Sequence, residues 1–185
     1  MEENIYKPKG TLKYYMVQKC SLIKVLEVFF IEPTSVHFIR EISRKINLAP
    51  TSVRIHINSL LKEGIILKKE SKPFNGYIAN RESEAFVYYK RAYNLITLKE
   101  IQKKITDELH PKTIAVFGSY SRGEDVETSD IDILVISKVK KEINFEGIEH
   151  ELKRKISIMI IDNFSKMDKN IQKKVMNGFV IHGGF

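Results

Sequence analysis

The chain has 185 residues, which at roughly 100 to 200 residues per domain is enough for one domain or for two small ones. Hydrophobic residues make up 43% and charged residues 29%, with 9 Gly and 5 Pro, which is typical of an ordinary globular protein and excludes collagen and low-complexity chains. The net charge of +8 is uneven: residues 1–110 carry 19 Lys and Arg against 12 Asp and Glu, and residues 111–185 carry 12 against 11. A basic first part indicates a polyanionic partner, usually nucleic acid.

Membrane and secretion signals are absent from the sequence pattern. No run approaches the ~18 consecutive apolar residues of a membrane span, and the best candidate, residues 25–31, is broken by Glu27. The first 20 residues lack the apolar core and cleavage site of a signal peptide. We therefore expect a cytoplasmic protein without a membrane partner. The single cysteine, Cys20, lies in an apolar run and is predicted to belong to the core.

Three helical patterns open the chain. Residues 18–31, 36–46 and 50–63 each place apolar side chains three and four positions apart. Pro50 suits the first turn of the third helix, and Gly64 is well placed to end it. The sequence therefore predicts three consecutive helices.

Strand patterns follow Gly64. Residues 65–69 and 77–79 are predicted as two strands of a hairpin, joined by a turn at residues 72–76. Three helices and a hairpin make a winged helix. The sequence resembles the winged helix-turn-helix superfamily across residues 18–80, most of all in APTSVRIHINSLLKEGIILKKE. This resemblance implies a DNA-binding domain, which we place at residues 1–82.

The outer face of the third helix carries hydroxyl, amide and basic side chains. Such side chains suit the base edges of a major groove and the phosphates beside it, so duplex DNA is the expected partner. The predicted DNA-binding residues are Thr51, Ser52, Arg54, Ile55, Asn58, Ser59, Lys62, Lys68, Lys69 and Lys72. Two alternatives to DNA binding remain: the face is an ordinary polar helix surface, or the winged helix docks a protein. A homodimer that reads two half-sites is a further expectation.

Residues 83–110 are predicted to be connecting helices that end near His110 and Pro111. Aromatic and aliphatic side chains recur there at mixed spacing of three and four, which favours core packing over a stacking platform for nucleotides. These residues are Phe86, Tyr89, Tyr93, Ile96, Ile101, Ile105 and Leu109. The remaining residues, 111–185, are expected to form a second domain.

Two carboxylates stand out in this second domain. A predicted buried strand at residues 113–117 leads into GSYSRGEDVETSDIDILV, in which Asp130 and Asp132 lie two positions apart in an apolar segment. On a strand, this spacing directs both side chains to the same face. Carboxylates held so close repel each other unless a cation lies between them. Oxygen ligands of this kind select Mg²⁺ or Mn²⁺.

An anion-binding turn precedes the carboxylates. Gly118 and Ser119 follow the strand directly, where glycine lets the backbone approach a ligand and the serine hydroxyl and free amides hold phosphate oxygens. Arg122 and Gly123 lie one turn further on. A phosphate cradle beside a metal pair is the arrangement that nucleotidyl transfer by two metals requires.

These residues look like the minimal nucleotidyltransferases of the DNA polymerase beta superfamily, whose pattern is Gly-Ser, Arg-Gly and Ser-Asp-x-Asp. The matching positions are Gly118, Ser119, Arg122, Gly123, Ser129, Asp130 and Asp132. The resemblance covers about residues 90–185, including a glycine-flanked apolar ending at residues 178–183. It implies an α/β domain with a mixed sheet, catalysis and metal binding by Asp130 and Asp132, and nucleotide binding by the other five. The expected fold class is thus α+β.

One position departs from the family pattern. The family usually places a third carboxylate on the next strand, which residues 155–161 match best, and the expected acid falls at Ser157. Asp162 is an odd number of residues away and is predicted to point to the opposite face. Binding of a nucleoside triphosphate is therefore a firmer expectation than turnover.

Two functions remain open from the sequence. The first is an enzyme that transfers a nucleoside monophosphate to an acceptor hydroxyl, and the resemblance implies that the acceptor could be a protein such as a toxin partner. The second is a DNA-binding transcriptional regulator whose degenerate transferase domain senses nucleotide.

Overall fold

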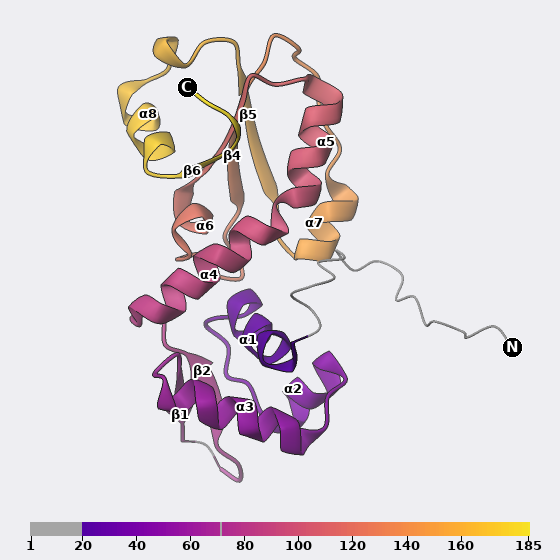
Figure 1. The fold of residues 1–185 in the computed structure, drawn as a ribbon, viewed down its shortest axis with the longest axis vertical. Coiled ribbons are helices and arrows are strands. Elements are labelled where there is room, and N and C mark those ends of the chain that lie inside the picture. The colour runs from indigo at the N-terminus through magenta and orange to yellow at the C-terminus, as the bar shows by residue number, and fades with distance from the viewer. Residues whose placement is uncertain (1–19, 71) are drawn as a thin grey trace, which may run out of the picture.

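The computed structural model describes residues 20–70 and 72–185. Two expectations concern residues outside these ranges: that the first 20 residues are not a signal peptide, and that the first helix starts at residue 18. Three helices and a β-hairpin are followed by an α/β part with a mixed four-stranded sheet (Figure 1), so the expected α+β class is confirmed. No helix within the described ranges is long and apolar enough to cross a membrane.

The N-terminal unit, residues 20–80, contains the three predicted helices and the hairpin. Its elements are α1 (Ser21–Ile31), α2 (Ile39–Ile46), α3 (Pro50–Lys62), β1 (Ile66–Lys69) and β2 (Gly76–Ala79). The apolar faces of the helices meet in one core, with Phe29, Ile42 and Ile57 fully buried. Gly64 follows α3 with a φ of +69°, a left-handed conformation that glycine adopts without strain.

Two details of this unit differ from the prediction. The second helix begins at Ile39 instead of residue 36, because His37 forms a β-bridge with Tyr77 of the hairpin through paired backbone hydrogen bonds of 2.8 and 2.9 Å. The prediction that Cys20 is part of the core is wrong, since its side chain is exposed. Cys20 occupies the extended position just before α1 and is therefore outside the buried stripe of that helix.

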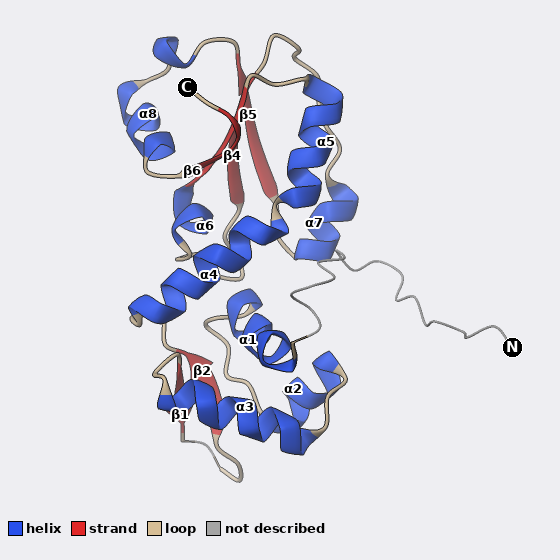
Figure 2. Cartoon of the chain, in the orientation of Figure 1, coloured by secondary structure: helices blue, strands red, loops and turns tan. Residues whose placement is uncertain are grey.

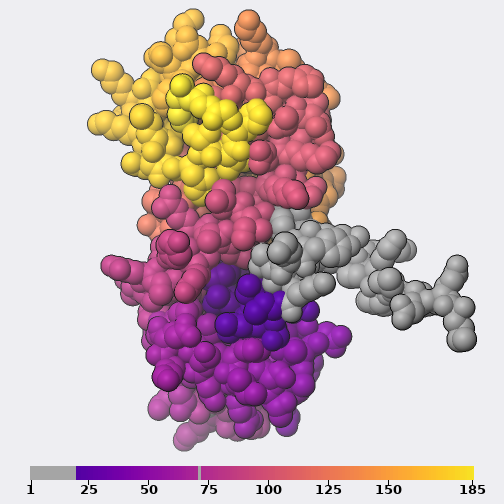
Figure 3. Space-filling view, viewed as in Figure 1, coloured from indigo at the N-terminus to yellow at the C-terminus, as the bar shows by residue number. Residues whose placement is uncertain are grey.

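Helix α4 (Glu84–Thr97) lies across the molecule between the N-terminal unit and the sheet (Figure 1). Its residue Phe86 packs into the core of the N-terminal unit. The next helix, α5 (Lys99–Leu109), instead buries Ile101 and Ile105 against the sheet. In the space-filling view, the atoms of α4 adjoin both parts (Figure 3).

The buried face of α4 is the predicted one only in part, since Phe86 is buried and Tyr93 packs against the N-terminal core as expected. Tyr89 and Ile96 were expected in the core, but 45% and 38% of their surface is exposed. Lys90, Asn94 and Thr97 are buried instead. An apolar pattern could not reveal this face, because most of its members are polar.

The second part is built on a sheet with strand order β5-β4-β3-β6. Its elements are β3 (Thr113–Phe117), α6 (Gly118–Arg122), β4 (Ile131–Ile136), α7 (Glu146–Leu152), β5 (Ile156–Ile161), a 3-10 turn (Phe164–Lys166), α8 (Lys169–Met176) and β6 (Phe179–Gly183). Strand β4 runs parallel to β5 and antiparallel to β3, which pairs antiparallel with β6. Helices α5 and α7 cover one face and α8 the other (Figure 2).

Glycines at the ends of β6 allow this strand to join the sheet. A Cβ atom at Gly178 would overlap the carbonyl oxygen of Val116, and one at Gly183 would overlap that of Lys112. The glycine-flanked apolar ending is therefore explained by close backbone packing against β3.

Candidate active site

Asp130 and Asp132 come together where β4 begins. Asp132 is the second residue of the strand and pairs with Phe117, the last residue of β3, while Asp130 lies one residue before the strand. Partial burial and the negative charge of Asp130 raise the pKa of the Asp132 carboxyl, and Lys174 opposes the shift. The two carboxylates are thus close enough to repel each other.

The surroundings of Asp132 fit a divalent cation. Gly118 has a φ of +75°, and a Cβ atom there would overlap a carboxylate oxygen of Asp132. Because glycine occupies this position, the Asp132 carboxylate can pack directly against the backbone at the start of α6. Two hard oxygen donors whose repulsion a cation would relieve suit Mg²⁺ or Mn²⁺, and Asp130 and Asp132 would hold the ion.

Of the predicted phosphate-binding residues, Gly118 lies against the Asp132 carboxylate, whereas Ser119 and Gly123 line a cavity to which neither Asp130 nor Asp132 contributes. Ser119 and Gly123 line a cavity of about 450 Å³ together with Arg81. The Arg122 side chain is about half exposed and donates to Glu124 at 2.7 Å.

Gly123 also has a packing role. Its φ is +72°, and a Cβ atom would lie 2.6 Å from the carbonyl oxygen of Val87 and 2.9 Å from the amide nitrogen of Arg91, both in α4. The Arg-Gly pair therefore allows α6 to pack closely on α4.

Ser129 shapes the backbone just before Asp130. Its hydroxyl accepts a hydrogen bond from the Val126 amide at 2.9 Å, and its own amide donates to the Val126 carbonyl at 3.0 Å. Ser129 and Asp130 also line a cavity of about 500 Å³, which His150 and Lys155 border on the other side.

The position next to Asp132 on β5 is Ser157, as the sequence predicted. The parallel pairing of β4 and β5 sets these two residues side by side. Asp162 follows the end of β5, five residues and about 16 Å further along the chain. It lines a separate cavity with Ser137 and His110 at the other end of the strands. The predicted strand register is confirmed, and Asp162 is far from the carboxylate pair.

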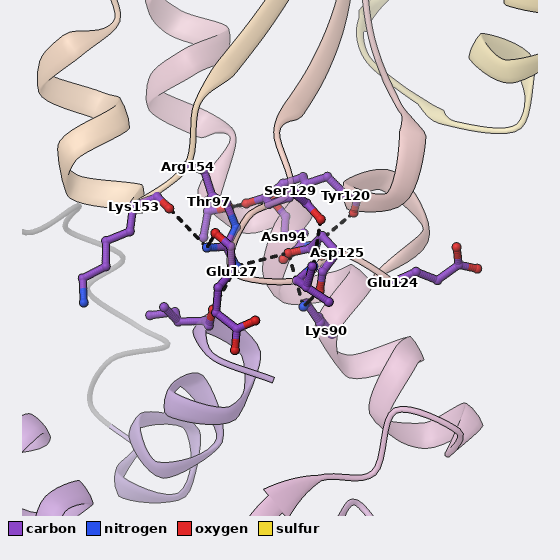
Figure 4. Close-up of polar contacts among 12 residues, drawn as sticks. Lys90, Asn94, Thr97, Tyr120, Glu124, Asp125, Glu127, Ser129, Lys153 and Arg154 are labelled. Atoms are coloured by element: carbon purple, nitrogen blue, oxygen red, sulfur yellow. Dashed lines mark hydrogen bonds and ion pairs between the residues drawn. The ribbon is translucent and has the colours of Figure 1, made fainter. Parts of the chain in front are cut away.

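Sequence reasoning missed a buried polar network behind the carboxylates (Figure 4). Asp125, which is 1% exposed, lies 3.2 Å from the ammonium of Lys90 and accepts a hydrogen bond from Asn94 at 2.7 Å. The Arg154 guanidinium lies 3.5 Å from the same carboxylate. Burial lowers the pKa of Lys90 to about 8, although the negative charge of Asp125 acts in the opposite direction. One sequence feature could have revealed this network: Phe86, Lys90 and Asn94 are spaced four residues apart, which places them on one face of a helix.

The predicted DNA-binding residues lie apart from this site, on α3 and the hairpin. All ten are at least partly exposed. Arg54 and Asn58 line a groove of about 620 Å³ that continues to Arg40 and to Phe74 and Tyr77 of the hairpin. The structure therefore leaves this basic face accessible.

Comparison with known proteins shows what the part of the chain around the carboxylate pair is similar to. Residues 98–182 match the nucleotidyltransferase domain family. Two candidate protein adenylyltransferases of Methanocaldococcus jannaschii are similar to this chain. MJ1215 is 53% identical over 49 residues, which are 24% of this chain and 57% of that protein. MJ1217 is 56% identical over 45 residues, which are 22% of this chain and 46% of that protein. The chain spans about half the length of these relatives. No solved structure matches it. Residues 98–182 are thus similar to nucleotidyltransferase domains, and α4 joins them to a unit of three helices and a β-hairpin.

Proposed function

We propose that the protein transfers an adenylyl group from ATP, bound with Mg²⁺ or Mn²⁺, to a hydroxyl group of a protein. The observation that carries this proposal is the Asp130–Asp132 pair, with Asp132 packed against Gly118, within residues that match the nucleotidyltransferase domain family. The names of the relatives, protein adenylyltransferases, support ATP as donor and a protein as acceptor.

The proposed reaction joins the acceptor oxygen to the α-phosphorus of ATP. The bond between the α-phosphorus and the bridging oxygen breaks, pyrophosphate leaves, and the acceptor proton passes to solvent. Asp130 and Asp132 hold the cation, which when bound neutralises charge on the phosphates. The nucleotide-binding residues are proposed to be Gly118, Ser119, Arg122, Gly123 and Ser129.

A thermal-shift measurement tests the site. Magnesium and ATP together should raise the melting temperature by mass action, and the double variant Asp130→Asn, Asp132→Asn should abolish the rise. Asp162→Asn, at the far end of the strands, is the matched control and should keep it. An unchanged rise in the double variant would place the nucleotide elsewhere.

A second candidate function, a nucleotide-sensing regulator without turnover, is favoured by Ser157 beside Asp132. The third carboxylate of a two-metal site helps to position the metal that activates the attacking hydroxyl, so a serine there impairs chemistry more than binding. Incubation with ATP labelled on the α-phosphate separates the two functions. Covalent label on the protein or a copurified partner supports the enzyme, and bound nucleotide without label supports the sensor.

For the N-terminal unit we propose a winged helix that binds duplex DNA. The exposed basic face of α3 and the hairpin supports this proposal. Full-length protein should bind duplex DNA with an affinity that falls steeply as salt rises, because bound phosphates release counterions. Replacing Arg54 and Lys62 by Ala should weaken binding and reduce the salt slope by about 2, one unit for each phosphate that is no longer neutralised. Undetectable or salt-independent binding would favour docking of a protein, and a homodimer would show binding to paired half-sites.

A further inference from the structure

The segment that leads to Asp130, residues 123–130, is held at several points, and we call it the Asp loop. The first point is Asp125, which turns inward to α4. Lys90 and Asn94 of that helix bind its carboxylate, and the Lys90 ammonium also donates to its backbone carbonyl (Figure 4). This end of the loop is therefore fixed to the connecting helix.

The second point is Glu127, which binds the N-terminal unit. One oxygen of its carboxylate accepts the Thr34 amide at 2.9 Å, and the other accepts the Thr34 hydroxyl at 2.8 Å. The Ser35 hydroxyl also donates to the first oxygen at 3.4 Å. Partial burial of the carboxyl opposes a low pKa, yet these hydrogen bonds and one from its own amide hold the pKa of Glu127 below its usual value. Both oxygens are thus engaged by the turn between α1 and α2.

The third point is Arg154, which precedes β5. One nitrogen of its guanidinium donates to the carbonyl of Ile31 at 2.9 Å, at the end of α1. Another donates to the carbonyl of Glu127 at 3.0 Å. Its side chain is only 5% exposed. A single buried cation therefore joins the last residue of α1 to the Asp loop.

Very little chain separates these attachments from the metal pair. Only Thr128 and Ser129 lie between Glu127 and Asp130. The reciprocal hydrogen bonds of Ser129 with Val126 close this stretch into a tight turn. A displacement of Glu127 is consequently carried to Asp130.

We propose that Glu127 and Arg154 are positioning residues, which make the turn at residues 31–35 of the N-terminal unit part of the framework that sets Asp130. This inference rests on the proposed function, because it makes the position of a proposed metal ligand depend on a turn that lies outside residues 98–182. Displacements of about 1 Å at a catalytic group can reduce rates on the order of 100-fold, so the attachment matters for catalysis as well as for stability.

The test uses full-length protein and reads the metal dependence. Glu127→Ala should raise the Mg²⁺ concentration for half-maximal ATP-dependent stabilisation by about tenfold, the size expected when charge-assisted hydrogen bonds are removed. Glu127→Gln keeps one acceptor oxygen and should recover part of the affinity. Thr34→Val, on the N-terminal side, should act in the same direction and add little in the Glu127→Ala background. Glu108→Ala is the control: it removes a surface carboxylate that forms an ion pair with Lys141, and it should leave the metal dependence unchanged.

Hydrogen exchange gives a second readout that needs no activity. Amides of residues 124–130 should exchange faster in Thr34→Val and in Glu127→Ala than in the wild type. If the wild type responds to magnesium and ATP but the Glu127 and Thr34 variants keep its metal dependence, this inference alone fails. If the wild type shows no such response, the proposed function fails and the inference fails with it.

Discussion

The carboxylate of Asp132 is partly buried, and the negative charge of Asp130 acts on it. The raised pKa of Asp132 means that its ionisation disfavours the folded state, so that stability falls as pH rises past its ordinary value of 3.8. A bound divalent cation removes this repulsion. The pair therefore costs the free protein some stability in exchange for ligand binding.

Ser157→Asp adds a third carboxylate beside this pair. In the absence of ligand the variant should melt a few degrees below the wild type, because the new charge increases repulsion at the start of β4. With magnesium and ATP it should be stabilised more than the wild type and should transfer adenylyl groups faster, since the third acid completes the metal site. Melting curves and transfer of label from ATP measure the two effects.

Asp162→Asn is the control for this experiment. It changes an acid that lies beyond the far end of β5 and should alter neither property. Loss of transfer in this variant, or no gain in Ser157→Asp, would contradict the assignment of the third position.

At the scale of elements, α4 holds a buried ion pair that joins it to the Asp loop. Asp125→Ala leaves the Lys90 ammonium buried without its carboxylate and should destabilise the protein by about 3 to 5 kcal/mol. Urea unfolding measures this loss. Asp107→Ala, which breaks an exposed pair with Lys103 on α5, should have a much smaller effect, because solvent screens an exposed ion pair. Equal costs for the two variants would show that the buried pair is not structurally important.

Local sequence patterns were sufficient for most elements of this fold. Helical spacing located α3, and the strand pattern around Asp132 correctly predicted Ser157 as its neighbour on the next strand. These features depend on residues that are close in sequence. The predicted core face of α4 is confirmed only for Phe86 and Tyr93, because the other buried positions hold polar residues, whose partners cannot be read from the helix alone.

The links between the two parts were beyond sequence reasoning for a related reason. Arg154 and its partner Ile31 are 123 residues apart, and the acceptor is a backbone carbonyl that any residue could supply. Glu127 similarly binds Thr34 across 93 residues. No local periodicity marks such pairs, so the candidate site was predicted without the groups that hold it in place.

For the whole molecule, Glu127 makes the link between the two parts depend on pH. Its pKa is lower in the folded protein than the ordinary 4.5, so its hydrogen bonds add stability above that pH, and this contribution is lost as pH falls through the folded pKa. The free energy of unfolding of the wild type should therefore drop more steeply than that of Glu127→Gln below about pH 5. Urea titrations between pH 7 and about pH 3 measure both curves, and parallel curves would contradict the link.

Because of the polar network around Asp125, a fragment of this chain must include α4 if it is to fold with the carboxylate site intact. A fragment begun at residue 98, where the family match starts, would keep the buried acid of the Asp loop but lack Lys90 and Asn94, and Gly123 would face water where it now packs on α4. Such a fragment would expose a carboxylate and a glycine-lined surface shaped for a helix. Exchange of the N-terminal unit for an unrelated one would similarly require a replacement that offers hydroxyl donors to Glu127 and a carbonyl to Arg154. Residues 98–185 thus restrict which units can be fused in front of them.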